Sequence, residues 1–74
     1  MEYSEGDKVR IGRYADIFSD NNLPYDTEFT VCDIDADDDY MPYCLAFGSG
    51  DTYWVLKTDI IGLLNPSAIK IGGE

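Results

Sequence analysis

Apolar and polar residues alternate with a period of two in several short stretches of the chain. Over residues 8–11, Val9 and Ile11 alternate with two basic residues, which is the pattern of a strand with one buried face. Strand-like patterns resume over residues 28–35 and in two aromatic and β-branched runs within residues 40–58. We predict strands in all of these stretches, with residues 40–58 forming a central hairpin.

The alternation is lost between residues 14 and 27. Isolated apolar residues stand there among Asp, Asn and Pro, which are turn formers. We predict a long loop with one helical turn over residues 15–18. Connections are usually about 4 to 6 residues long, and longer ordered loops commonly carry function.

The C-terminal part of the chain predicts one helical turn and one short strand. Residues 59–64 suit a single turn, with Thr58 or Asp59 able to cap it. Pro66 then interrupts the pattern, and residues 69–71 alternate again as a closing strand.

The two cysteines help to set a strand register. A three-residue loop over residues 37–39 brings apolar residues together on one face and the cysteines together on the other. Directly opposed Cβ atoms lie about 4.5 to 5.5 Å apart, so we expect the two thiols to crosslink within the chain on oxidation. The expected pairs are Phe29 with Phe47, Val31 with Leu45, and Cys32 with Cys44.

The turn at residues 48–51 leaves two facings open for the strand that follows it. A four-residue loop directs Trp54 and Leu56 into the core, whereas a three- or five-residue loop directs Tyr53 and Val55 there. We favour Val55 inside and Trp54 on or near the surface.

This order of elements predicts an all-β fold, a small SH3-like barrel of about five strands. It has a long loop between strands 1 and 2 and one short helical turn before the last strand. Residues 1–74 make one domain, near the size at which folding buries only about 60% of the surface of the unfolded chain.

Several short motifs resemble the small SH3-like β-barrel proteins encoded in phage and prophage genomes. The resemblance spans residues 6–64, and the long acidic stretch between strands 1 and 2 departs from the simplest pattern of that group. The resemblance implies the fold and a phage origin, and it indicates a specific function less strongly. The motifs are Gly-Asp-Lys-Val-Arg-Ile at 6–11, Thr30-Val31 before acidic residues, Asp-Asp-Tyr-Met-Pro-Tyr at 38–43, and Asp-Thr-Tyr-Trp-Val at 51–55 with Asp59-Ile60.

The charge balance restricts the partners. Fifteen acidic residues against five basic ones, with no His, give a formal net charge of -10 at pH 7. Such a surface repels nucleic acids and anionic membranes and attracts basic partners. With no secretory signal pattern and no long apolar stretch, we expect a cytoplasmic protein that binds another protein.

Acidic residues form the first candidate site. Between Tyr14 and Asp39 there are nine acidic residues and no basic one. An EF-hand loop starting at Asp33 would need Gly at position 38 and Glu at position 44, where the chain has Asp38 and Cys44. The residues predicted to bind a partner are Asp16, Asp20, Asp26, Asp33, Asp35, Asp37, Asp38 and Asp39.

Three interpretations of these aspartates stay open. They can form a solvated turn held by Asx-turns, or bind a cation weakly. They can also mimic a nucleic acid, because carboxylates two residues apart on a strand are spaced by about 6.6 Å, which is comparable to the phosphate spacing. A mimic would block the basic site of a host defence or transcription protein.

Aromatic residues form the second candidate site. The core is too small for all of them, so some must line the surface, where Tyr and Trp are enriched at the centres of interfaces. The alternative is that they are partly buried rim residues with solvated hydroxyls. The predicted set is Tyr40, Tyr43, Tyr53 and Trp54.

Catalysis has little basis in the sequence. The chain has no His to act as a base, and neither cysteine has an activating cation beside it in sequence. We predict no catalytic residue, no metal site and no cofactor. The expected function is that of an acidic binding protein acting on a host factor, with a nucleic-acid mimic and a self-associating structural component as alternatives.

Overall fold

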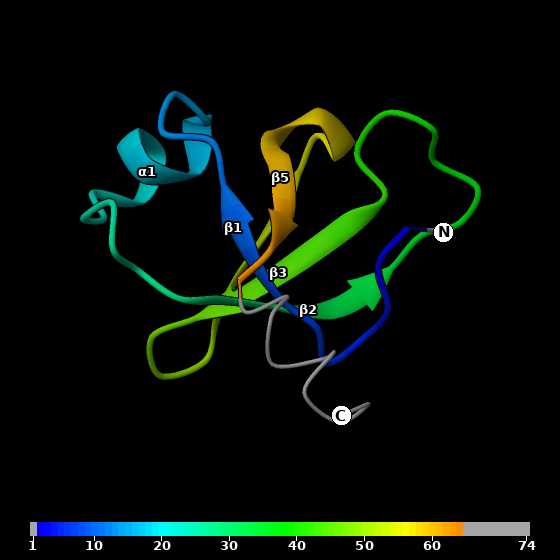
Figure 1. The fold of residues 1–74 in the computed structure, drawn as a ribbon, viewed down its shortest axis with the longest axis horizontal. Helices are drawn as coiled ribbons and strands as arrows, with labels where there is room; N and C mark the ends of the chain where they lie inside the picture. The colour runs from blue at the N-terminus through cyan, green and yellow to red at the C-terminus, as the bar shows by residue number, and fades with distance from the viewer. Residues whose placement is uncertain (1, 65–74) are drawn as a thin grey trace, which may run out of the picture.

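A five-stranded antiparallel sheet organises the chain, in the strand order β4-β3-β2-β1-β5 (Figure 1). The computed structural model describes residues 2–64. The mostly-β expectation and the five strands are confirmed. The elements are β1 (Lys8–Ile11), α1 (Asp16–Asn21), β2 (Phe29–Ile34), β3 (Tyr43–Phe47), β4 (Asp51–Val55), the 3-10 helix η1 (Lys57–Asp59) and β5 (Ile60–Leu63).

The core lies on the face of the sheet where the alternate apolar residues of the strands meet. Phe29 stacks edge-to-face with Phe18 of α1 at 5.7 Å and with Phe47 of β3 at 5.8 Å between ring centroids. Leu45, which is fully buried, and Val9 of β1 belong to the same buried cluster. These contacts explain why the alternating stretches of the sequence form strands.

The segment between β1 and β2 contains a helix of six residues, longer than the single turn predicted over residues 15–18. Its residues Ile17 and Phe18 are buried in the core. The helix ends where Asn22 adopts the left-handed conformation at φ 54°, which Asn tolerates better than most residues. Two apolar anchors therefore hold a segment that is otherwise polar.

The predicted register between β2 and β3 is right at one end and wrong at the other. Val31 lies opposite Leu45, as expected, but the ladder shifts after it and Cys44 pairs with Asp33. Cys32 is thus the extra residue of a β-bulge, in which two residues of one strand face one residue of the other. The connection from β2 to β3 accordingly covers residues 35–42 and not only 37–39.

The C-terminal elements differ from the prediction in position, although their order is as expected. The helical turn covers residues 57–59, and the residues predicted to form it are mostly in β5, which pairs with β1. Ile60 is buried and Ile61 is exposed, which is the alternation of a strand, and β-branched residues favour strands. The closing strand predicted over residues 69–71 lies outside the described residues.

The turn between β3 and β4 has three residues, because Phe47 pairs with Asp51. Gly48 and Gly50 adopt positive φ angles there, 61° and 125°, which other residues rarely take. Val55 is consequently buried, and Trp54 is 38% exposed. The favoured facing of this strand is confirmed.

Replacing Leu45 by alanine tests the role of the buried centre. The residue is fully buried, and such truncations cost about 2–5 kcal/mol. That is a large part of the roughly 5–15 kcal/mol that stabilises typical domains. Urea denaturation should show the loss, whereas Ser49→Ala in the exposed turn should stay within about 0.5 kcal/mol. Equal effects of the two substitutions would contradict this account of the core.

Candidate functional site

Residues 35–42, which we call the acidic loop, fold into a defined structure between β2 and β3. The Asp35 amide donates to the Pro42 carbonyl at 2.8 Å and closes the base of the loop. The Asp38 amide donates to the Asp35 carbonyl at 3.1 Å and forms a turn inside it. In Figure 1 the loop lies at the end of the molecule opposite to α1.

Two aspartate side chains hold the backbone of the acidic loop. The Asp37 amide donates to Oδ1 of Asp35 at 3.2 Å. The Tyr40 and Met41 amides donate to Oδ1 of Asp38 at 2.8 and 2.9 Å. These hydrogen bonds, chiefly the one from Met41, lower the pKa of Asp38 because they favour its charged form. The Asx-turn interpretation is confirmed for these two residues.

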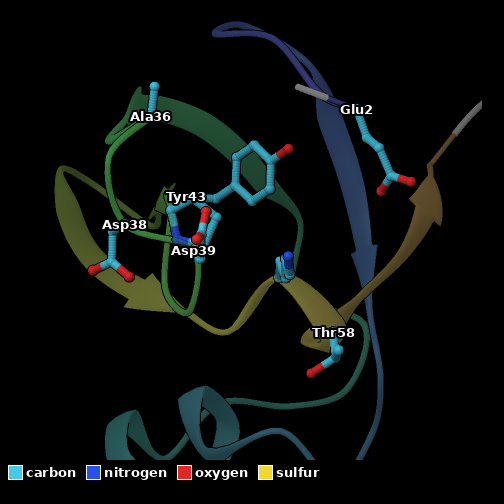
Figure 2. Close-up of a pocket in the computed structure, with 8 residues that line it drawn as sticks. Glu2, Ala36, Asp38, Asp39, Tyr43 and Thr58 are labelled. Carbon is cyan, nitrogen blue, oxygen red and sulfur yellow. The ribbon is translucent and has the colours of Figure 1, made fainter.

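A groove of about 540 Å³ opens beside the acidic loop (Figure 2). It lies where the loop meets the N-terminal segment and η1, and the Lys57 amide ties η1 to the loop by donating to the Tyr40 carbonyl at 3.2 Å. In the part of the chain that the structure describes, eight residues line the groove: Glu2, Ala36, Asp38, Asp39, Pro42, Tyr43, Lys57 and Thr58.

Ring packing and a hydrogen bond hold the apolar part of the groove. Pro42 and Tyr43 are buried. The Tyr43 ring packs edge-to-face against Tyr3 at 5.5 Å between centroids, and its hydroxyl accepts a hydrogen bond from the Tyr3 amide at 3.4 Å. The N-terminal segment therefore helps to hold the aromatic residue at the base of the groove.

Carboxylates surround this apolar base. Figure 2 shows the Tyr43 ring between Glu2 on one side and the acidic loop, with Asp38 and Asp39, on the other. Among residues 2–64, Lys57 is the single cation that lines the groove. Three carboxylates against one ammonium leave the groove with a net negative charge.

The other predicted acidic residues lie elsewhere. Asp16 and Asp20 are on α1, and the Tyr53 hydroxyl donates a hydrogen bond to Asp20. This bond, burial and the nearby charges raise the pKa of Tyr53 to about 12. Burial and the charge of Asp16 raise the pKa of Asp59, against the hydrogen bond that it accepts from Leu56. Asp20 thus links α1 to β4, and none of these three carboxylates lines the groove.

The remaining predicted aspartates are exposed at separate places. Asp26 lies between α1 and β2, and Asp33 accepts a hydrogen bond from the Ile34 amide at 2.8 Å. Asp37 is exposed on the acidic loop. The acidic set predicted from the sequence is therefore split among the groove, the α1 cluster and single positions.

The predicted aromatic set does not form one surface either. Tyr40 is 70% exposed on the acidic loop, but Tyr43 is 3% exposed, so its predicted surface position is wrong. Tyr53 and Trp54 are neighbours on β4, and neighbouring residues of a strand point to opposite faces. The Tyr53 side chain packs toward the core and α1, whereas Trp54 lies across from Cys44.

Two features were missed by the sequence analysis. Glu2 and Lys57 line the groove, although both are distant in sequence from the acidic loop, and no local pattern marks them. Arg13 lies over the rings of Tyr14 and Tyr25, at 5.7 and 5.3 Å from their centroids. The adjacent Arg and Tyr of the long loop were the signal for this second contact.

Comparisons with protein-family models, with curated proteins and with solved structures found no match. Within residues 2–64, no group of three or more His, Cys, Asp or Glu side chains is placed to hold a metal ion. No helix in the same range is long and apolar enough to cross a membrane.

Acid should release the acidic loop through Asp38. Its pKa is lowered from the ordinary 3.8, so its stabilising effect is present above that value and is lost as the pH falls through the lowered pKa. NMR shifts of the Tyr40 and Met41 amides should move together below pH 3.8. Asp38→Asn should keep the loop folded without this transition, because its side-chain oxygen still accepts hydrogen bonds. The same transition in the variant would contradict the assignment.

Alkali should weaken the link between Tyr53 and α1. The folded-state pKa of about 12 exceeds the ordinary 10.0, so the stabilisation is complete below pH 10 and is lost as the pH rises toward 12. Spectrophotometric titration should show a phenol ionising near pH 12 that disappears in Tyr53→Phe and persists in Tyr40→Phe. A late transition that survives Tyr53→Phe would rule out this assignment.

Proposed function

We propose that this protein is a non-catalytic acidic binding protein whose groove takes a lysine or arginine side chain from a partner protein with a basic surface. One observation carries the proposal. The groove combines a buried apolar base, Pro42 and Tyr43, with carboxylates of Glu2, Asp38 and Asp39 around it.

This combination suits the two parts of a long basic side chain. The methylene stem of Lys or Arg packs on apolar surface while its charged head stays near water. Carboxylates at the rim can accept charge-assisted hydrogen bonds from that head. Asp38 is already fixed by backbone amides, so little ordering is needed when a ligand arrives.

Lys57 provides a specific test of the proposal, because its positive charge repels a basic ligand. It lines the same groove as Asp39. Removing the Lys57 charge should strengthen the binding of a basic peptide, and removing the Asp39 charge should weaken it. Opposite signs from two exposed residues distinguish this groove from a general attraction to an acidic protein.

The same proposal includes an SH3-like barrel fold, a phage origin and a host protein as the partner. An SH3-like barrel is supported by the sheet order, the long segment between β1 and β2, and the helical turn before β5. The motif resemblance supports a phage origin and, with it, a host protein as the partner; action in the cytoplasm is part of the same proposal. In the mimic version, the ligand would be a nucleic-acid-binding protein, and Asp16, Asp20 and Asp26 would contribute as much as the groove.

An NMR titration with a short Gly-Arg-Leu-Arg-Gly peptide tests the groove. We expect shifts at the amides of Asp39 and Lys57, and weaker binding as salt rises, because exposed charges are screened over about 8–10 Å near physiological salt. Exposed charge pairs contribute about 0.2–1 kcal/mol. Asp39→Asn should therefore raise the Kd by a factor of up to about five, and Lys57→Gln should lower it similarly.

Asp26→Asn is the matched control, because it removes the same charge at an exposed position outside the groove. Its effect on the Kd should be smaller than that of Asp39→Asn. Equal effects would favour the distributed acidic array of a mimic. A peptide with citrulline in place of arginine should not bind, and shifts away from the groove would refute the assignment.

A further inference from the structure

The bulge in β2 places the two cysteines of the chain beside each other. Cys32 has no partner of its own in the ladder, because Val31 pairs with Leu45 and Asp33 pairs with Cys44. Its Sγ lies 3.4 Å from the Cys44 carbonyl oxygen and donates to it. The two residues of a bulge face the same residue of the partner strand, so Cys32 and Asp33 both lie across from Cys44, and a disulfide spans Cα atoms roughly 4.4–6.8 Å apart.

The two thiols differ in their access to solvent. Cys32 is exposed, whereas Cys44 is 5% exposed. Partial burial and hydrogen bonding to the Cys44 side chain raise the pKa of Cys32. One sulfur is therefore available to a reagent, and the second is shielded from solvent beside it.

We propose that Cys32 and Cys44 are a redox modification site that closes into a disulfide across the base of the acidic loop. The oxidant belongs to the class of low-molecular-weight disulfides, such as glutathione disulfide. The Cys32 thiolate attacks one sulfur and releases one glutathione thiolate. The Cys44 thiolate then attacks Sγ of Cys32 and releases the second. The two cysteine protons pass to the two released thiolates, so one disulfide is formed and one is reduced.

The location of the two cysteines determines how a disulfide between them would affect the acidic loop. Cys32 is on β2 and Cys44 is on β3, on the two strands that lead into and out of the acidic loop. The backbone bond from the Asp35 amide to the Pro42 carbonyl already joins these stems nearby. A covalent link beside it would restrict opening of the loop. This effect on the loop does not depend on the identity of any ligand of the groove.

Mass spectrometry of the reduced full chain treated with glutathione disulfide tests the site. The product should be a monomer that has lost two hydrogen atoms and carries no glutathione. The emission of Trp54, the only tryptophan and the cross-strand neighbour of Cys44, should fall, because contact with a disulfide quenches indole fluorescence. Backbone amides of the acidic loop should exchange with deuterium more slowly in the oxidised protein.

Two variants separate the steps. Cys44→Ala should stop as a stable mixed disulfide on Cys32, and Cys32→Ala should stay unmodified while folded, because Cys44 is buried. If Cys44→Ala fails to fold, the wild type and Cys32→Ala still decide the outcome. A persistent glutathione adduct on the wild type, intermolecular disulfides alone, or unchanged exchange in the acidic loop would overturn the proposal.

Discussion

The packing of β2 against β3 over Phe29, Val31 and Leu45 is the constraint on which the rest of the structure depends. These side chains are almost completely buried, and a chain of this length has few others with which to exclude water. Their contacts fix the pairing of Val31 with Leu45. The position of every later feature, from the bulge to the acidic loop, follows from that pairing.

Polar residues replace apolar ones where this packing ends, in the connection between β2 and β3. Beyond Val31 the register shifts, the ladder continues through Asp33 with Cys44 and Ile34 with Tyr43, and a polar connection then replaces it. Its backbone groups still require hydrogen-bond partners. Aspartate side chains supply some of them, as Asp38 does for Tyr40 and Met41. The acidic loop brings Pro42 and Tyr43 next to the N-terminal segment and η1, and the groove lies where these three parts of the chain come together.

The sequence predicted what depends on local pattern and missed what depends on distant contacts. Alternation located β1 through β4, because a period of two directly reports which residues share a face. The inward facing of Val55 was favoured, but it depended on the length of the turn before β4, which alternation does not give. It did not locate the bulge, since an extra residue such as Cys32 leaves no sign in the composition. It misplaced β5, because a short run such as Ile60–Leu63 suits a turn as well as a strand until its pairing with β1 is known.

In the candidate site, too, the local features were predictable from the sequence and the distant contacts were not. The acidic character of the loop was evident from the sequence, and so was its tendency to form Asx-turns. Glu2 and Lys57 could not be assigned to the site, because only the fold brings them to it. Tyr43 was predicted to lie on the surface, because nothing local distinguishes an aromatic residue at the base of a groove from an exposed one.

The use of Asp38 as a backbone acceptor has a consequence for how this protein can change during evolution or design. The carboxylate that gives the acidic loop part of its charge also defines the loop's shape. Replacing it by a residue without a side-chain acceptor would alter both properties in one step. The charge at this position can therefore be lost without a change of shape only through a neutral residue that still accepts hydrogen bonds, such as asparagine, whereas Asp37 and Asp39, both exposed, can vary in charge more freely.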